Sequence, residues 1–318
     1  MSRYFAYALA LFAAWMPATW GQSFPSRPVH LVVPFPAGGT ADLLARSIAE
    51  VLAESWRQPV VVENKPGAGS LLATQHVQRA TPDGATLLMV APSFVVNPMV
   101  NRDAGYEALR DFTPVALLVT SPLVVAVNPQ SPAKSLKDLV ELARANPGKL
   151  TFAAVGPNTT QQMIGEMLSI ESKIDWAYAP YPGGAPSVTA ALGNHVAAVI
   201  ANYSEVSAHL AAGKLRALAV GTRERLDTLK DVPTLAELGY SLIDATIWFG
   251  IVVPVGTPGA VVERIRADLQ RAVSLPAVRE KLVAQSLYPV ATSEPFGAFL
   301  AAQSQRYAGL VRQAGLRK

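Results

Sequence analysis

The chain has no cysteine and only four histidines. Without cysteine there is no disulfide framework, no thiol nucleophile, no thiolate metal site and no lipidated cysteine after a leader. The histidines are scattered, and neither a His-Glu-x-x-His motif nor a Gly-x-Ser-x-Gly nucleophile motif occurs. The sequence therefore predicts neither catalytic residues nor a metal site. We interpret each histidine as a surface or structural group: His30, His76, His195 and His209.

Charge and nucleotide-binding motifs are also scarce. Charged residues make up only 16% of the chain, the net charge is +4, and no dense Lys/Arg stripe with interleaved aromatics occurs. We therefore expect no nucleic-acid partner. Gly67-Ala68-Gly69 resembles the start of a dinucleotide loop, but Leu72 stands where that fingerprint requires a small residue, and no Walker-type Gly-Lys-Ser/Thr exists. No nucleotide or other cofactor is predicted.

Hydrophobic residues are plentiful, at 50% of 318 residues, which is enough to build a large core and most naturally two domains. At the start, Arg3 precedes an apolar run over Tyr4–Trp15, followed by Pro17 and small residues, which is the layout of a secretory signal peptide. We predict that residues 1–21 are this signal peptide, removed after Gly21, with Ala18 or Ser23 as the alternative end, and that the mature protein is periplasmic. A retained anchor is the alternative, but the run is shorter than the roughly 20 residues of a membrane span.

Apolar runs rich in Val, Ile and Leu alternate with helical patterns along most of the chain. This alternation predicts an α/β architecture in which helices cover parallel sheets. Two extended runs, Thr120–Pro129 and Trp248–Pro254, are interpreted as crossings between two lobes. Lobe 1 then comprises residues 22–122 and 247–318, lobe 2 comprises residues 123–246, and a ligand cleft lies between them.

Local signals predict some of the element boundaries. The apolar runs at Val115–Val119 and Leu123–Val127 are predicted as separate strands, and no helix is predicted between residues 81 and 134. Thr159 is predicted to start a helix, because Gln162 follows it at capping-box spacing.

The segment from Val32 to Asp42 is the most informative, because an apolar strand passes through a small-residue loop directly into a helix. Its two glycines let backbone N–H groups approach a ligand. The helix that begins near Thr40 adds unpaired amides and a partial positive charge. A carboxylate or a phosphate would suit this junction. The alternative interpretation is an ordinary strand-to-helix turn capped by Thr40.

The same arrangement occurs twice more, at Ala154–Gln162 and at Tyr178–Pro186. If the first two junctions belong to different lobes, their helix N-termini face each other across a groove at the carboxyl ends of the strands. A small molecule with an acidic group at each end would then be held by both. An ordinary turn remains the alternative at each junction.

Other side chains near these loops have open roles. Asp42 is explained as a partner for the dipole of its helix, although a ligand contact is the alternative. With Glu63, Asp83 and Glu166 it lies near loops or helix starts, which leaves a general acid/base pair open. Aromatic residues either wall a groove or pack in the core: Phe35, Phe94, Tyr181, Trp248 and Phe249.

Seven segments match a known pattern in order and spacing. They are Pro34–Asp42, Val61–Gly69, Pro82–Gly84, Pro147–Leu150, Tyr181–Pro186, Ala212–Val220 and Trp248–Gly250. On these segments the chain, from about Phe24 to its C-terminus, resembles the solute-binding receptors of tripartite tricarboxylate transporters, the Bug or TctC-like periplasmic receptors.

The resemblance implies a type II periplasmic-binding-protein fold, whose two lobes close on a small organic anion held by loop amides, hydroxyls and ordered water. It implies a monomeric, non-catalytic receptor that delivers a mono-, di- or tricarboxylate to membrane transporter subunits. The ligand-binding residues that it implies are Phe35, Ala37, Gly38, Gly39, Thr40, Asp42, Ser93, Gly156, Asn158, Thr159, Thr160, Tyr181, Gly183 and Asn202.

The chain departs from that family in its central part. The family usually has glycine where Asn158 stands, histidine where Gln162 stands, and an aspartate where Ala201 precedes Asn202. Where the family has a Gly-Gly-x-Val-Asp segment, this chain has Gly193–Ala197, which reads Gly-Asn-His-Val-Ala. These changes concern the part of the binding site that the central lobe provides more than they concern the fold. Asn158 is compatible with a left-handed backbone, which asparagine tolerates well.

Two rival functions stay open at this point. An exported hydrolase or lyase acting on a small organic acid would need a nucleophile or base beside the bound molecule. A ligand-sensing accessory of a two-component system would bind the same class of ligand but dock on a receptor kinase.

Overall fold

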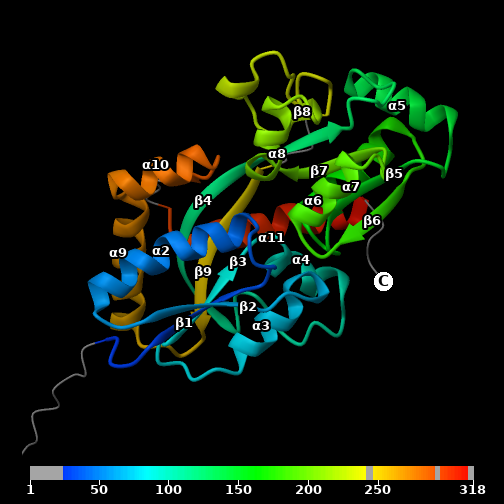
Figure 1. The fold of residues 1–318 in the computed structure, drawn as a ribbon. Coiled ribbons are helices and arrows are strands. Elements are labelled where there is room, and N and C mark those ends of the chain that lie inside the picture. Colours follow the sequence, from blue (N-terminus) through cyan, green and yellow to red (C-terminus); the bar gives the residue numbers. More distant parts are fainter. Residues whose placement is uncertain (1–23, 241–245, 291–293, 314–318) are drawn as a thin grey trace, which may run out of the picture.

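The computed structural model describes residues 24–240, 246–290 and 294–313 (Figure 1). The predicted signal peptide lies outside these residues. The strands, in chain order, are β1 (Val29–Val33), β2 (Val60–Asn64), β3 (Thr86–Val90), β4 (Phe112–Val127), β5 (Thr151–Val155), β6 (Ala177–Tyr181), β7 (Ala198–Asn202), β8 (Arg216–Val220), β9 (Thr246–Pro254) and β10 (Tyr288–Pro289).

The helices alternate with these strands, as the sequence pattern predicts. They are α2 (Thr40–Trp56), α3 (Leu71–Gln78), α4 (Ser93–Val100), α5 (Leu136–Ala145), α6 (Thr160–Ser172), α7 (Gly184–Leu192), α8 (Tyr203–Ala211), α9 (Gly259–Ser274), α10 (Pro276–Ala284) and α11 (Phe296–Gln313). Short 3₁₀ turns occur at Ala68–Ser70 and Asp227–Leu229. In the part of the chain that the structure describes, no helix is long and apolar enough to cross a membrane.

The strands form two groups that β4 connects. Along the sheet their order is β2-β1-β3-β9-β4-β7-β5-β6, and β8 and β10 also pair with β4. In the first group β1 pairs in parallel with β2 and β3, and in the second β5 pairs in parallel with β6 and β7. Figure 1 shows the two groups with their helices as two bodies joined by β4 and β9. The predicted two-lobe α/β fold is therefore confirmed.

Strand β4 passes from one lobe to the other. Its first part, Phe112–Pro122, pairs with β9, whereas Leu123–Val127 pairs with β7 and β8. The prediction of two separate strands here was wrong, because the structure has one strand of 16 residues. Proline lacks a backbone N–H and is tolerated in a strand where a ladder bond is not needed, and Pro122 stands at the point where β4 changes partners.

Helix α4 was missed by sequence reasoning. It contains Pro98 and consists mostly of apolar residues, several of them β-branched, which are poor helix signals. Packing stabilises it instead: Phe94 is buried, its ring stacks on Tyr106, and it meets Phe112 edge to face. This packing places the first turn of α4, with Ser93, at the end of β3.

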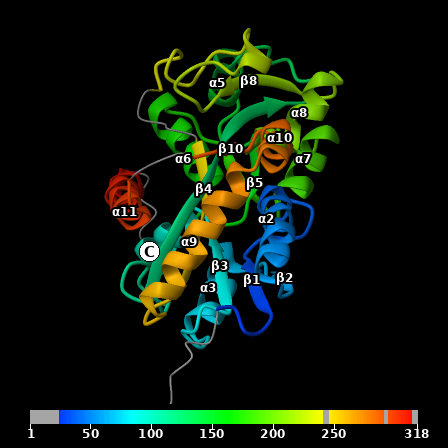
Figure 2. The ribbon, with the colours of Figure 1, turned by 90° about the vertical axis from the view of Figure 1, so that its left-hand side faces the viewer.

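Helices cover both faces of each lobe. One apolar cluster joins α2 and α9 to β1, β3 and β4, and Figure 2 shows these two helices on the same side of the sheet. A second cluster packs α3, α4 and α11 on the opposite face. In the other lobe, α5 and α6 pack on one face of β5 and β7, and α7 and α8 on the other. Strands buried on both faces agree with their continuous apolar runs.

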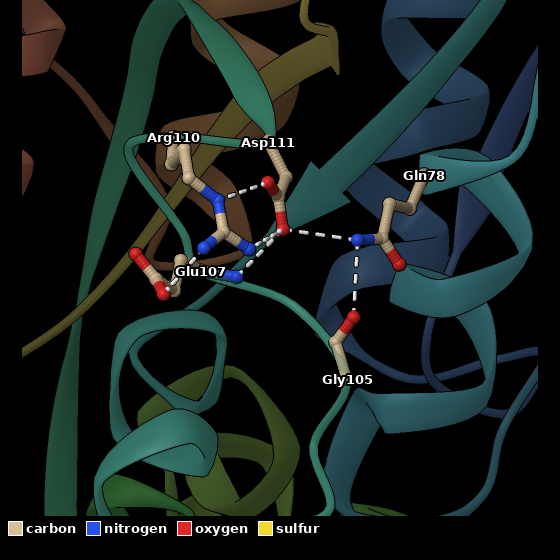
Figure 3. A network of polar contacts seen from close by, with 5 residues as sticks. All are labelled: Gln78, Gly105, Glu107, Arg110 and Asp111. Atoms are coloured by element: carbon tan, nitrogen blue, oxygen red, sulfur yellow. Dashed lines mark hydrogen bonds and ion pairs between the residues drawn. The ribbon is translucent and has the colours of Figure 1, made fainter.

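A polar network holds the loop that leads into β4 (Figure 3). Asp111 accepts hydrogen bonds from Gln78 Nε2 at 2.9 Å, from the backbone N–H of Glu107 at 2.8 Å and from Arg110 Nε at 2.7 Å. These contacts lower the pKa of Asp111, and the hydrogen bond from the Arg110 guanidinium has the largest effect. Gln78 also donates to the carbonyl of Gly105. The network ties this loop to α3 and so fixes where the crossing strand begins.

Candidate functional site

A cavity lies between the two lobes where five helices begin. Its wall is built from the loops that follow β1, β3, β5 and β6, from the last residue of β7, and from the first turns of α2, α4, α6, α7 and α8. Strand β9 closes it with Ile247 and Phe249. Helix N-termini carry unpaired N–H groups and partial positive charge, so a cavity with five of them is suited to an anionic group.

Nine of the fourteen residues predicted as ligand contacts line this cavity. They are Phe35, Ala37, Gly39, Thr40, Ser93, Thr159, Thr160, Gly183 and Asn202. Gly156 and Tyr181 line a second cavity, of about 410 Å³, which shares Phe35, Val155 and Thr159 with the first. The first cavity encloses only about 50 Å³. The lobes are therefore close together around this cavity.

Three of the predicted residues line neither cavity, and Asp42 and Gly38 are two of them. The Asp42 carboxylate is buried and accepts hydrogen bonds from Gly38 N–H at 2.9 Å, Arg46 Nε at 3.0 Å and Asn64 Nδ2 at 3.0 Å. Burial alone would raise the pKa of Asp42, but these hydrogen bonds, led by that of Arg46, lower it below its usual value. Gly38 has a φ of 81°. The pair shapes the loop rather than the cavity wall.

Asn158 is the third such residue, and it connects the two lobes. Its φ of 64° lies in the left-handed region, as its residue type led us to expect. Its side-chain Nδ2 donates to Asn97 Oδ1 of α4 at 2.9 Å, and its backbone N–H donates to Gln162 Oε1 at 2.8 Å. The Thr159 hydroxyl accepts from the backbone N–H of Gln162, which confirms the predicted helix start.

Thr40 makes a second connection between the lobes. Its Oγ1 lies 2.8 Å from Ser204 Oγ, accepts from Asn202 Nδ2 at 3.0 Å and donates to Glu205 Oε1 at 3.2 Å. The backbone also comes close elsewhere, because a Cβ added to Gly69 would overlap the carbonyl of Pro157. Backbone and side-chain contacts on both sides of the cleft thus hold the lobes together.

Sequence reasoning missed Glu205, which lies in the cavity wall. Burial raises the pKa of its carboxyl group, and hydrogen bonds with Asn202 and Thr40 offset part of that rise. The backbone N–H of Asn202 donates to Glu205 Oε2 at 3.3 Å. A signal was present, since Asn202-x-x-Glu205 has capping-box spacing before a helix. Among the described residues that line the first cavity, Glu205 alone has an ionisable side chain.

Three polar side-chain atoms in the wall of the first cavity lack a partner within the described residues. Thr160 Oγ1 and Gln161 Oε1 belong to the first turn of α6, and Asn202 Oδ1 belongs to the last residue of β7. All three residues are no more than 4% exposed. Leaving a buried polar atom unpaired costs about 1–3 kcal/mol. Because these three residues line the cavity, a bound molecule is a fitting partner for them.

The aromatic candidates divide between wall and core. Phe35 and Phe249 line the first cavity, and Tyr181 lines the second. Phe94 and Trp248 are buried in the core, where the Trp248 ring meets Phe296 and Phe299 edge to face. The apolar part of the wall would therefore cover the hydrocarbon portion of a ligand.

The sequence offered four carboxylates for a general acid/base pair, and none of them lines the first cavity: Asp42, Glu63, Asp83 and Glu166. Glu63 pairs with His30 at 2.5 Å and with Lys65 at 3.2 Å, and Asp83 pairs with Arg27 at 2.6 Å. No second carboxylate joins Glu205 in the described wall of that cavity. The geometry therefore has no general acid/base pair there.

Comparisons with known proteins agree with this geometry. Residues 44–316 match the family model of the tripartite tricarboxylate transporter family receptor, TctC. The protein BugT of Bordetella pertussis is 36% identical over 296 residues, which cover 92% of this chain and 91% of BugT.

Two solved structures of carboxylate complexes are also similar. Rpa4515 of R. palustris, solved with adipate, has a TM-score of 0.86 and 30% identity, with 92% of this chain and 98% of that chain covered. MatC of Rhodopseudomonas palustris, solved with bound malate, has a TM-score of 0.86 and 28% identity, with 91% and 100% covered.

Proposed function

The chain belongs to the tripartite tricarboxylate transporter receptor family, and on this premise we propose that it captures a small organic carboxylate and presents it to membrane transporter subunits. It is a periplasmic-type solute-binding receptor, and its family and structural neighbours are binding proteins rather than enzymes. The adipate and malate held by two neighbours support the ligand class.

The observation that carries the proposal is the meeting of five helix N-termini at one interlobe cavity, with the Thr160 hydroxyl unpartnered in its described wall. Carboxylate oxygens accept hydrogen bonds and carry negative charge, which is what these helix ends and hydroxyls attract. The sole ionisable group among the described residues of the wall is an acid, so backbone amides and neutral side chains would bind the anion, without an arginine.

In this proposal ligand binding stabilises the closed arrangement. A ligand favours one conformation only if it interacts more strongly with it. A molecule between the first turns of α2 and α6 touches both lobes only when they are closed. We propose that one lobe comprises residues 22–122 and 247–318 and that the other comprises residues 123–246. The change of strand partners in β4 after Pro122 supports the boundary at residue 122.

Location and assembly belong to the same proposal. The signal-peptide pattern in residues 1–21 supports export to the periplasm, and we propose that the receptor acts there as a monomer. Delivery to transporter subunits, rather than to a sensor kinase, rests on the family.

The experiment is to identify the ligand and then measure its effect. Native mass spectrometry of freshly purified protein identifies any retained molecule, and a thermal-shift panel of organic acids ranks candidates, because a ligand selective for the folded form raises Tm. We expect at least one carboxylate to raise Tm while its uncharged amide does not. Failure of every carboxylate to bind, or turnover of the bound acid, would contradict the proposal. Recovery of transporter subunits in a membrane pull-down supports delivery, whereas recovery of a sensor kinase contradicts it.

A further inference from the structure

The cavity wall has two polar parts that differ in charge, called here the Glu205 end and the α6 end. At one end the Glu205 carboxyl group lies against the starts of α2 and α7: Thr40 Oγ1 donates to it, and a Cβ added to Gly184 would overlap it. At the α6 end the first turn of that helix presents the unpartnered Thr160 hydroxyl, and that turn has no acidic side chain. The positive end of α2 is thus already next to a carboxyl group of the protein.

Among the residues that the structure describes, no cationic side chain pairs with Glu205. On α2 the next charged group, Asp42, faces Arg46 and Asn64 instead, and on α8 the Tyr203 hydroxyl bonds to Thr228. Helix α7 has no titratable residue, and the described wall of the cavity has no Lys, Arg or His. A buried carboxylate needs a compensating charge or a proton, since removing it from water is costly.

Two ligand chemistries meet this need differently. An ammonium group at the Glu205 end provides the missing counter-charge and lets the carboxylate stay ionised. A second carboxylate at that end meets a like charge unless Glu205 is protonated, and like charges in one site disfavour each other.

Building on the proposed function, we propose that Glu205 determines specificity: the cleft selects a ligand with one carboxylate at the α6 end and an ammonium or other hydrogen-bond donor at the Glu205 end, and discriminates against dicarboxylates. The carboxylate would accept from Thr160 Oγ1 and the amides of the first turn of α6. The donor group would lie between Glu205 and Asn202, and the apolar chain between would lie against Phe35 and Phe249.

Protonation of Glu205 should change the affinities for the two ligand classes in opposite directions. Because burial raises its pKa, a protonated form is available for a dicarboxylate at low pH. As pH rises through that pKa, the affinity for a dicarboxylate falls by about tenfold per pH unit. The affinity for an amino-carboxylate rises over the same interval and then levels off.

The test uses isothermal titration calorimetry on the mature protein with matched ligands. The amino-carboxylates are β-alanine, 4-aminobutyrate and 6-aminohexanoate, and the dicarboxylates are malonate, glutarate and adipate. The variant is Glu205→Gln, which keeps the shape and the acceptor oxygen but removes the charge. The matched control is Glu166→Gln, a half-buried glutamate of α6 whose pKa is also raised by burial and which lines neither cavity.

We expect the wild type to bind an amino-carboxylate about tenfold or more tightly than the matched dicarboxylate. Glu205→Gln should lose this preference, because its affinity for amino-carboxylates falls and its affinity for dicarboxylates rises. Glu166→Gln should bind both classes as the wild type does. Equal or tighter binding of dicarboxylates by the wild type above the pKa of Glu205 overturns the specificity proposal. An unchanged preference in Glu205→Gln also overturns it. In both cases the proposed carboxylate receptor function stands. If no carboxylate of either set binds, the proposed function itself fails.

Discussion

The starts of α2 and α6 share one sequence signature but differ in what they offer a ligand. Each follows a strand and a loop of small residues, and each has a threonine in its first turn. The Thr40 hydroxyl of α2 is engaged by Ser204, Asn202 and Glu205. The Thr160 hydroxyl of α6 has no partner within the described residues. One helix start therefore helps to join the lobes, while the other remains available for a ligand.

The largest effect is expected from filling the cleft at the α2 end. Gly39 has a φ of −84°, and an added Cβ would make only ordinary contacts, the nearest at 3.7 Å. Gly39→Leu should abolish detectable ligand binding in calorimetry, because the side chain occupies the cavity. It should change the free energy of unfolding by less than about 1 kcal/mol.

The matched control for that change is Gly259→Leu. Gly259 opens α9, and an added Cβ would meet nothing within 4 Å. This variant should bind as the wild type does. Normal binding by Gly39→Leu would show that the ligand lies elsewhere.

A paired substitution tests the difference between the two threonines. Thr160→Val should weaken binding of a carboxylate by roughly 10- to 100-fold, because a hydrogen bond to a charged group is lost. It should not lower the free energy of unfolding, because the hydroxyl has no partner in the described residues of the empty protein. Thr40→Val leaves buried polar partners unpaired and should cost about 1–3 kcal/mol of stability. Chemical denaturation and calorimetry on both variants separate these effects; equal behaviour of the two would remove the distinction.

A smaller effect is expected from the contact that joins α6 to α4. Asn158→Gly keeps the left-handed backbone but removes the hydrogen bond from Asn158 Nδ2 to Asn97 Oδ1. We expect ligand affinity to fall by about two- to tenfold, because one net hydrogen bond of the closed state is lost. Asn194→Gly is the control, since Asn194 has a φ of 56° just beyond α7. An affinity loss of the same size in both variants would assign the effect to the backbone instead.

The smallest effect concerns pH and the two acids near the start of α2. The folded-state pKa of Glu205 is raised above the ordinary value of 4.5, so its contribution to stability is lost as pH rises through the folded pKa. The folded-state pKa of Asp42 is lowered from 3.8, so its contribution is present above that value and lost as pH falls through the folded pKa. Denaturant unfolding across pH should show a shallower decline at higher pH for Glu205→Gln. An identical pH curve for wild type and variant would mean that Glu205 is not the group that titrates.

Much of the frame of the cleft was predictable from local patterns. Alternating apolar runs and helical periods predicted parallel sheets covered by helices, and the loops at Pro34–Asp42 and Ala154–Gln162 do meet at one cavity. The capping spacing of Thr159 and Gln162 located the start of α6. These features depend on near neighbours in the chain, so the residues themselves carry the signal.

The errors arose where distant residues decide the outcome. Helix α4 has weak local propensity and depends on packing around Phe94. Asp42 was a candidate ligand contact, but Arg46 and Asn64 bind its carboxylate, and Asp42 does not line the cavity. Glu205 was overlooked because a capping glutamate most often faces water, whereas here the starts of α2 and α7 cover it.

By itself the sequence determined that strands run into helix starts with exposed amides, because turn chemistry and helix capping act over a few residues. The tertiary structure alone decided which of those starts remains open to a ligand. The Thr40 hydroxyl and the Glu205 carboxylate are 165 residues apart in sequence and 3.2 Å apart in space. A hydrogen bond depends on that spatial distance, and only the packing of one lobe against the other sets it.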